Sequence, residues 1–261
     1  MSAREDDRPL GYETIIIVGG GCYGGYYVRQ LHRAALAGAL VAKSIVVVDR
    51  DGDCAVAKSL EDGTTAPVPT NIRVAEWREF FSAYLTAAAG SPRHHEHDAI
   101  VPSPLMPHLM AEWLIERARE RWPARSVAVA PVDRPVDVPW QRAGSDDTHY
   151  VSFAEWTCPI NCIEPRTCPV TRGPRSWSLP PTVSAYAAQS SAKAAVMHCR
   201  HRTFGVGMFD TAEVLAADAI IREGGEAGAC DVFVATTSHC HGAITRLAIG
   251  PPPSEGNSPD H

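Results

Sequence analysis

The stretch Ile15-Ile-Ile-Val-Gly-Gly-Gly-Cys-Tyr-Gly24 decides the fold of this chain. Its β-branched half predicts a buried strand from Thr14 to Val18, and the glycines that follow predict a tight turn. The turn keeps the spacing G-x-G-x-x-G between a strand and a helix, which is expected to run from about Gly24 to Ala39. The sequence therefore predicts a strand–turn–helix unit of the type that binds a dinucleotide.

Each glycine of the turn has a physical role at its position. Gly19 allows the tight turn, Gly21 lets a pyrophosphate approach the backbone, and Gly24 lets the helix pack on the strand. The unpaired amides at the helix N-terminus and the helix dipole favour an anion there. A diphosphate site is predicted at the turn, and a lobe that has lost its nucleotide is the alternative.

The next strand, Ser44 to Asp49, ends in a carboxylate. In this position Asp49 is expected to accept hydrogen bonds from both ribose hydroxyls of the nucleotide. The carboxylate would repel the extra phosphate of NADP, whereas the adjacent Arg50 would attract it. NAD is therefore the predicted cofactor.

Strands and helices alternate as far as residue 132, and the pattern changes after it. The alternation predicts an α/β protein with a Rossmann-like, doubly wound parallel sheet, followed by an α+β portion that carries a cysteine-rich loop. In the first half, strands are expected at 72–74, 98–101 and 126–132, and helices at 77–88 and 106–121. In the second half, strands are expected at 148–156, 203–209, 231–237 and 243–249, and helices at 182–198 and 211–223. The expected organisation is a disordered tail (1–12), a dinucleotide-binding domain (13–132), a metal-binding portion (133–250) and a second disordered tail (251–261).

The first third to half of the chain resembles a known nucleotide-binding lobe. The segments Ile15–Gly25 and Val46–Asp51 are similar to that lobe in potassium-uptake regulators, and less closely to precorrin-2 dehydrogenases. The resemblance implies that NAD or an adenine nucleotide binds at the three motif glycines and Asp49. Neither family has a counterpart of the cysteine loop, and no family resembles the whole chain.

Three cysteines stand close together in the second half. Cys158, Cys162 and Cys168 have the spacing C-x3-C-x5-C in a proline-rich loop. The prolines stiffen the turns, so that three soft sulfur ligands come within reach of one metal centre. A closed site needs a fourth ligand.

The segment Ser238–Gly242, at the end of an expected strand, supplies the candidates for that ligand. Cys240 would complete an all-thiolate set that suits an iron–sulfur cluster. His239 or His241 would instead make a Cys3His zinc site. The iron–sulfur cluster is the prediction, with zinc and a metal-free thiol site as alternatives.

Two residues are candidates for catalysis. His108 ends the segment Pro102–His108 at the carboxyl end of a strand, where it would be a proton donor or a contact to nicotinamide. A core or capping histidine is the alternative. Arg172, beside Arg175 in the cysteine loop, would bind an anionic substrate or balance thiolate charge, or else cap loop carbonyls. In the run His94–Asp98 neighbouring side chains point to opposite faces and cannot all reach one ion, which predicts a solvated loop, with metal binding as the alternative.

Composition excludes several classes of function. The net charge is -6 and the basic residues are scattered, so no nucleic-acid partner is expected. The N-terminus is charged and no apolar run is long enough to span a bilayer, which predicts a cytoplasmic protein without membrane insertion. In a reducing compartment clustered cysteines favour metal binding over disulfides. The expected partners are a small-molecule substrate or a redox partner protein, and a homo-oligomer is compatible with the sequence.

Together these features predict an NAD(H)-binding redox protein, an oxidoreductase with a cysteine-ligated metal centre. The alternative is a non-catalytic regulatory or complex subunit that senses nucleotide and metal state. A thiol enzyme that uses Cys240 beside His239 or His241 is a third hypothesis.

Overall fold

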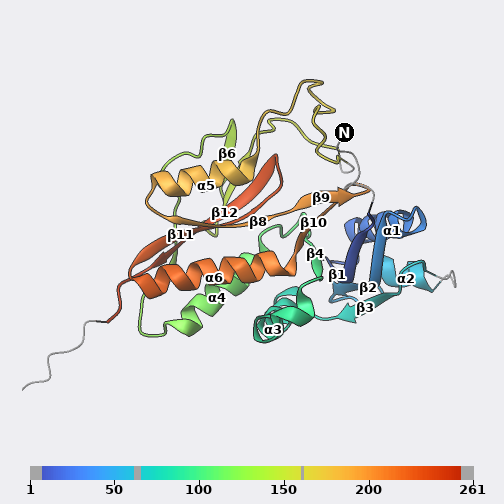
Figure 1. Cartoon of the computed structure of the whole chain (residues 1–261), viewed down its shortest axis with the longest axis horizontal. Helices are drawn as coiled ribbons and strands as arrows, with labels where there is room; N and C mark the ends of the chain where they lie inside the picture. The colour runs from blue at the N-terminus through green and yellow to red at the C-terminus, as the bar shows by residue number, and fades with distance from the viewer. Residues whose placement is uncertain (1–7, 62–65, 160–161, 254–261) are drawn as a thin grey trace, which may run out of the picture.

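The computed structural model describes residues 8–61, 66–159 and 162–253. Figure 1 shows two sheets side by side, with helices packed on their faces. The first part of the chain forms β1 (Leu10–Val18), α1 (Cys22–Leu36), β2 (Leu40–Asp49), α2 (Ala55–Leu60), β3 (Thr70–Val74), α3 (Trp77–Gly90), η1 (Pro92–His95), β4 (Ala99–Val101), α4 (Leu109–Arg121) and β5 (Val127–Ala130). The second part forms β6 (Trp140–Ala143), β7 (His149–Ser152), α5 (Leu179–Gln189), β8 (Lys193–His198), β9 (Arg200–Thr203), β10 (Val206–Asp210), α6 (Thr211–Ala227), β11 (Cys230–Thr237) and β12 (His241–Ile249). None of the helices in the described part of the chain has the length and hydropathy needed to cross a membrane.

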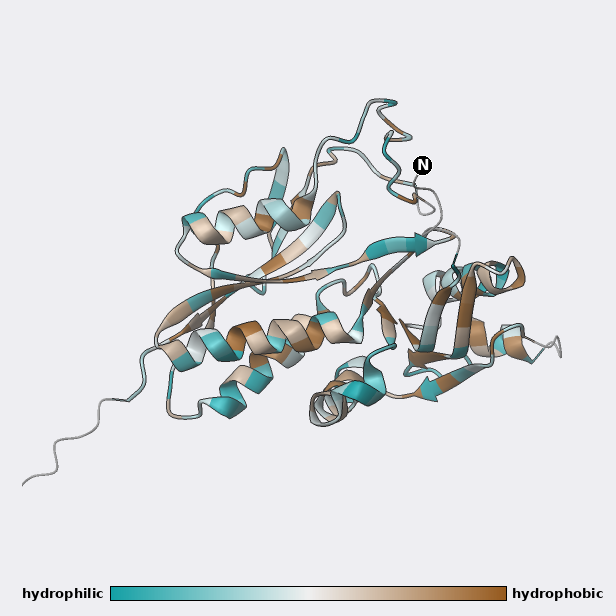
Figure 2. Ribbon diagram, viewed as in Figure 1, coloured by the Kyte–Doolittle hydropathy of each residue, from teal (hydrophilic) through white to brown (hydrophobic). Residues whose placement is uncertain are grey.

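The first sheet has the strand order β3-β2-β1-β4-β10-β9, and its first four strands are parallel. The side chains of successive β1 residues point to opposite faces of this sheet. Ile15 and Ile17 pack in the core beneath α1, whereas Ile16 and Val18 pack in the core with α3, α4 and α6. Because both faces are covered, β1 is a continuous hydrophobic run and not an alternating one. Figure 2 shows β9 as hydrophilic, whereas β1 and β2 each have a hydrophobic part.

A hairpin from the second half of the chain completes this sheet. β10 pairs antiparallel with β4, and β9 pairs antiparallel with β10. Phe204 and Gly205 make the turn between them, with φ of 46° and 77°. Positive φ at two successive turn residues fits the right-handed twist of hairpin strands.

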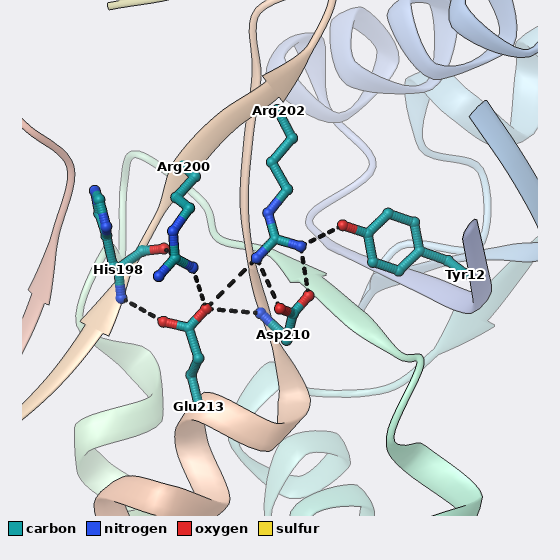
Figure 3. A network of polar contacts seen from close by, with 6 residues as sticks. All are labelled: Tyr12, His198, Arg200, Arg202, Asp210 and Glu213. Carbon is teal, nitrogen blue, oxygen red and sulfur yellow. Dashed lines mark hydrogen bonds and ion pairs between the residues drawn. The ribbon is translucent and has the colours of Figure 1, made fainter. Parts of the chain in front are cut away.

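Partly buried ion pairs hold this hairpin against β1 (Figure 3). Both Nη atoms of Arg202 donate to the carboxylate of Asp210 at 2.7 Å, and Nη1 also donates to the hydroxyl of Tyr12. Asp210 in turn caps α6 in a capping box with Glu213, which also pairs with Arg200 at 2.5 Å. The network therefore joins the start of α6 and both hairpin strands to the first strand of the chain.

The second sheet has the order β6-β7-β12-β11-β8, and β5 pairs with β12. It is mostly antiparallel; only β8 and β11 run parallel to each other. Helix α5 covers one face and α4 and α6 cover the other (Figure 1). One hydrophobic core runs from β1 and α3 through α4 and α6 to β11 and β12, so the two sheets share it.

The predicted α/β class is confirmed: a mostly parallel sheet with helices is followed by a second sheet, and the cysteine loop lies in the C-terminal part. The expected border at residues 132 and 133 does not separate the two sheets. The strand expected at 126–132 is β5, but it pairs with β12 and not with the first sheet. The hairpin β9–β10 belongs to the first sheet although it lies beyond that border.

Two further expectations differ from the structure. The helix expected at 182–198 is α5 followed by β8, because the chain turns at Ser191, whose φ is 52°. The tail expected to be disordered as far as residue 12 includes the start of β1, where Leu10 pairs with Leu40 and Tyr12 is buried. The remaining parts of both predicted tails, 1–7 and 254–261, lie outside the described residues.

Candidate functional site

The glycine turn and the end of β2 line one cavity of about 460 Å³. It lies at the carboxyl ends of the parallel strands, where ligands of open α/β sheets collect. Its walls come from the turn, the end of β2, the start of α3 and the segment after β4. We call it the nucleotide pocket, and the lining residues are Val18, Gly19, Gly21, Cys22, Tyr23, Gly24, Asp49, Arg50, Glu76, Trp77, Ser103, Leu105 and Met106.

The three motif glycines have different surroundings in this turn. Gly19 has a φ of 89°, a conformation that a side chain disfavours. A Cβ atom at Gly24 would lie 1.9 Å from the carbonyl oxygen of Gly19, so α1 packs against the turn with no room for a side chain. A Cβ atom at Gly21 would meet nothing within 4 Å. The space in front of Gly21 is open to the pocket, as a cradle for a diphosphate requires.

Asp49 connects the turn to β2. Its Oδ2 accepts a hydrogen bond from the Gly20 amide at 2.6 Å, and Oδ1 accepts one from the Asp51 amide at 2.9 Å. A carboxylate has about four acceptor positions, so two remain for hydroxyl donors in the pocket. The Trp77 ring packs against Gly19 of the turn, and its Nε1 donates to the Val48 carbonyl of β2 at 2.9 Å. The sequence motif gave no signal for this role of Trp77.

The four predicted metal ligands line a second, much smaller cavity. Cys158, Cys162, Cys168 and Cys240 meet there, although Cys240 is 72 residues beyond Cys168 in the chain. The loop that carries the first three lies at the top of Figure 1, between β7 and α5. We call this cavity the cysteine pocket; its volume of about 10 Å³ has room for one water-sized sphere.

Glu164 attaches the turn of Cys240 to the cysteine loop. Its buried carboxylate accepts hydrogen bonds from the amides of His239 at 3.2 Å and Cys240 at 3.3 Å. Burial alone would raise the pKa of Glu164, but the Ser238 hydroxyl, the charge of His201 and the His239 amide lower it. Glu164 therefore stays ionised, and its charge faces the turn that brings Cys240 into the pocket.

The environments of the four thiols differ. Burial raises the pKa of Cys240 to about 11, and burial with the neighbouring Cys162 and Cys168 raises that of Cys158. The backbone and hydroxyl of Thr171 lower the pKa of Cys168, although its side chain is largely buried. A bound positive charge would lower the pKa of the Cys158 and Cys240 thiols and favour their thiolate forms.

His241 lies next to the cysteine pocket and contacts one of its thiols. Its Nε2 lies 3.3 Å from Cys158 Sγ and its Nδ1 lies 3.0 Å from Ser152 Oγ. The Ser152 hydroxyl donates to the Ala154 carbonyl, so towards His241 it acts as acceptor. Nδ1 therefore carries the proton, and Nε2 presents its lone pair to the thiol. A hydrogen bond of this kind also orients metal-ligating histidines.

The side-chain types in the cysteine pocket suit a metal ion, but the distances between the side chains do not. Two indole N–H groups face the sulfurs: Trp177 donates to Cys240 Sγ at 3.2 Å, and the buried Nε1 of Trp156 bonds to no described residue. Thiols and indole donors suit a soft cation and the charge of its thiolates. Among the described residues, however, no three His, Cys, Asp or Glu side chains form a group that could hold a metal ion. The thiols meet in one pocket but do not converge on one point.

His108 does not lie in the nucleotide pocket. It is buried at the N-terminus of α4, where Nδ1 lies 3.0 Å from Thr236 Oγ1 and Nε2 lies 3.1 Å from Thr245 Oγ1. Burial lowers its pKa to about 4, against a smaller opposite effect of Asp146. With both nitrogens bonded to hydroxyls of the second sheet, His108 has the position of a core histidine, the alternative to the predicted catalytic one.

The arginines of the cysteine loop occupy different positions. Arg172 is exposed and has a φ of 58°, and it lines none of the described cavities that contain the other predicted site residues. Arg175 donates to the carbonyls of Pro165 and Glu164 at 3.1 and 2.8 Å. Arg175 therefore caps loop carbonyls, and nothing in the structure assigns a substrate to Arg172.

The run His94–Asp98 has a structural role, because its side chains hydrogen-bond to neighbouring elements. His95 Nδ1 lies 2.8 Å from Asp98 Oδ2, and Asp98 also accepts hydrogen bonds from Tyr84 and the Thr14 amide. The buried carboxylate thereby holds η1 against β1 and α3.

The fold and these two pockets define the class: an α/β protein with a glycine-turn pocket at the end of a parallel sheet and a thiol-lined pocket in its second half. Residues 110–250 match the model of the family AF_1314_C, described as "Uncharacterized protein, C-terminal domain". The match covers more than half of the 261 residues, so the chain belongs to this family. It runs from α4 through β12 and includes all four cysteines of the cysteine pocket. No curated protein and no solved structure matches the chain.

Proposed function

We propose that the protein is an NAD(H)-dependent oxidoreductase whose cysteine pocket holds a metal ion. The observation that carries the proposal is the nucleotide pocket: three motif glycines and Asp49 line one cavity, and Gly21 leaves its centre open. The N-terminus of α1 supplies amides and a dipole for the diphosphate, and Asp49 supplies acceptors for the ribose.

The metal belongs to the proposal because four thiols line one pocket and two indole groups lie beside them. A single zinc ion is the simpler occupant, because a structural zinc site needs four protein ligands in a tetrahedron and no inorganic sulfide. Cys158, Cys162, Cys168 and Cys240 would hold it as thiolates, with His241 next to them.

Calorimetry of the purified protein with NAD and with NADP tests the first half of the proposal. We expect NAD to bind more tightly, because Asp49 would repel the phosphate of NADP. No binding of either nucleotide, or equal affinity for both, contradicts it. Oxidation of bound NADH by an added acceptor then separates an oxidoreductase from a sensor.

Metal analysis and an absorption spectrum after anaerobic purification test the second half. We expect about one zinc per chain and no charge-transfer bands. A visible spectrum with bound iron and acid-labile sulfide would replace the zinc ion by a cluster. Cys168→Ser should lose the metal and lower thermal stability, whereas Cys230→Ser, outside the pocket, should keep it. A metal-free wild-type protein with unchanged stability contradicts a metal centre of either kind.

The sensor alternative is supported by one observation. The nucleotide pocket and the cysteine pocket have no lining residue in common among the described residues. Direct chemistry between the two would need a molecule that bridges them, whereas a conformational link would not.

A further inference from the structure

Trp77, the first residue of α3, contacts both the end of β2 and the glycine turn. Its ring lines the nucleotide pocket, and its Nε1 donates to the Val48 carbonyl at 2.9 Å. The same carbonyl accepts a hydrogen bond from the Gly19 amide, also at 2.9 Å. Gly19 follows β1, Val48 lies in β2, and Trp77 follows β3. One carbonyl with two donors therefore joins the ends of three parallel strands at the turn.

The Trp77 ring also limits the movement of the turn. Gly19 has a φ of 89°, and a Cβ atom built on it would lie 3.1 Å from Cζ2 of Trp77. The ring therefore occupies the space beside Gly19 that a side chain would need. Glycine is the most flexible residue of a chain, so a glycine turn needs contacts from outside to keep one conformation. Trp77 supplies such a contact at the first glycine of the motif.

The second residue of the turn is held by other elements. The Gly20 amide donates to Asp49 Oδ2 at 2.6 Å, and the Gly20 carbonyl accepts a hydrogen bond from the Val56 amide at 3.0 Å. The amides of residues 21–23, at the start of α1, donate to no described residue. These amides are the ones expected to bind a diphosphate. The direction in which they point depends on how Gly19 and Gly20 are held.

We infer that Trp77 is a positioning residue, which holds the glycine turn in the conformation that directs the α1 amides at a diphosphate. The inference deepens the proposed function, on which it rests, because it gives α3 a part in diphosphate binding that the glycine motif does not contain. A turn that is already held binds its anion without first being ordered. Loss of the indole should therefore weaken diphosphate binding through the turn, without any contact between Trp77 and the ligand.

Two variants of Trp77, titrated with NAD, ADP and inorganic pyrophosphate, test this inference. Trp77→Phe keeps a ring beside the turn and loses the hydrogen bond to Val48, whereas Trp77→Leu loses the ring as well. The dissociation constants should rise about three- to tenfold in Trp77→Phe and at least about tenfold in Trp77→Leu. The factor should be the same for all three ligands, because pyrophosphate shares only the diphosphate with the others. A loss for NAD and ADP with pyrophosphate unchanged means that Trp77 contacts the nucleoside, and overturns the inference.

Thermal melts and tryptophan emission separate positioning from ordinary packing. Trp140→Phe is the matched control, because Trp140 is an exposed tryptophan of β6 and lies outside the nucleotide pocket. It should bind all three ligands as the wild type does. Of the six tryptophans, all of them in the described part of the chain, Trp77 alone lines this pocket, so NAD should change the emission of the wild type and Trp140→Phe but not of Trp77→Phe. A lower melting temperature of the Trp77 variants with unchanged affinity in the folded state overturns the inference.

NAD affinity of the wild type, measured by calorimetry, separates the two levels of the proposal. If the wild type binds NAD and both Trp77 variants bind it as tightly, the inference fails and the proposed function stands. If the wild type does not bind NAD, the proposed function fails. Pyrophosphate binding to the wild type, and its loss in Trp77→Phe, then still decides whether Trp77 positions an anion-binding turn.

Discussion

Gly21→Ala should abolish most NAD binding without unfolding the protein. A Cβ atom at this position meets nothing within 4 Å, and the backbone φ of Gly21 is -73°, which alanine adopts readily. Alanine is a clearly poorer N-cap than glycine, but it lowers the entropy of the unfolded chain by a comparable amount of free energy. The free energy of unfolding should therefore change by less than about 0.5 kcal/mol.

Nucleotide affinity should respond much more strongly. The new methyl group would occupy the space in front of the α1 N-terminus, where the diphosphate is proposed to lie. Displacement of the phosphate would remove at least one charge-assisted hydrogen bond, which contributes about 1.5–3 kcal/mol. The dissociation constant for NAD should rise roughly 10- to 150-fold.

Gly24→Ala, on the same turn, is the matched comparison. Its Cβ atom would lie 1.9 Å from the Gly19 carbonyl oxygen, so the helix or the turn must move. We expect a loss of about 1–3 kcal/mol in the free energy of unfolding, measured by urea denaturation. Calorimetry with NAD completes the comparison. If the folded Gly21→Ala variant binds NAD as tightly as the wild type, the diphosphate does not lie at this turn and the argument from the cradle is wrong.

Three further predictions follow from single residues. Asp49→Ala should weaken NAD more than NADP and should also lower stability, because the carboxylate holds the Gly20 amide; calorimetry and thermal melts separate the two effects. Arg202→Met should reduce the free energy of unfolding by about 1–2 kcal/mol in urea, since the half-buried Asp210 carboxylate loses its cation and keeps only its bond to the start of α6. His108 should make stability depend on pH: its folded pKa of about 4 lies below the unfolded value, so the unfolded chain binds the proton first as pH falls. Stability should be constant above about pH 6.5 and fall by about 3 kcal/mol between there and pH 4, and His108→Gln should flatten that part of the profile.

The nucleotide pocket was predictable from sequence because its determinants are local. The glycine spacing and the β-branched run lie within ten residues of one another, and the carboxylate follows at the end of the next strand. Parallel pairing of β1 and β2 then brings these segments to one edge of the sheet without any further information. The contribution of Trp77 had no such signal, because a tryptophan at the start of a helix is equally consistent with ordinary packing.

The partition of strands between the two sheets was not predictable in this way. β5 has the composition of a buried strand, and nothing in its four residues tells which sheet it joins. β8 was expected as helix because Lys193-Ala-Ala-Val-Met-His198 continues the alanine-rich pattern of α5. Its strand conformation follows from parallel pairing with β11, so a long-range contact overrides the local propensity. The same holds for His108, whose hydroxyl partners come from β11 and β12.

The cysteine pocket depends partly on local sequence and partly on long-range contacts. The spacing of Cys158, Cys162 and Cys168 predicted that these three thiols lie close together. The position of Cys240 beside them depends on Glu164, which accepts hydrogen bonds from the backbone amides of His239 and Cys240. Glu164 has a φ of 49°, an unfavourable conformation for a side chain of this kind. Two features of this loop lower the stability of the folded protein. The backbone is strained at Glu164, and the buried Glu164 carboxylate stays charged close to thiols whose pKa values are raised. Such costs are retained where the surroundings need the arrangement. The loop therefore keeps the turn of Cys240 against the other three thiols, which is the arrangement that the proposed metal site requires.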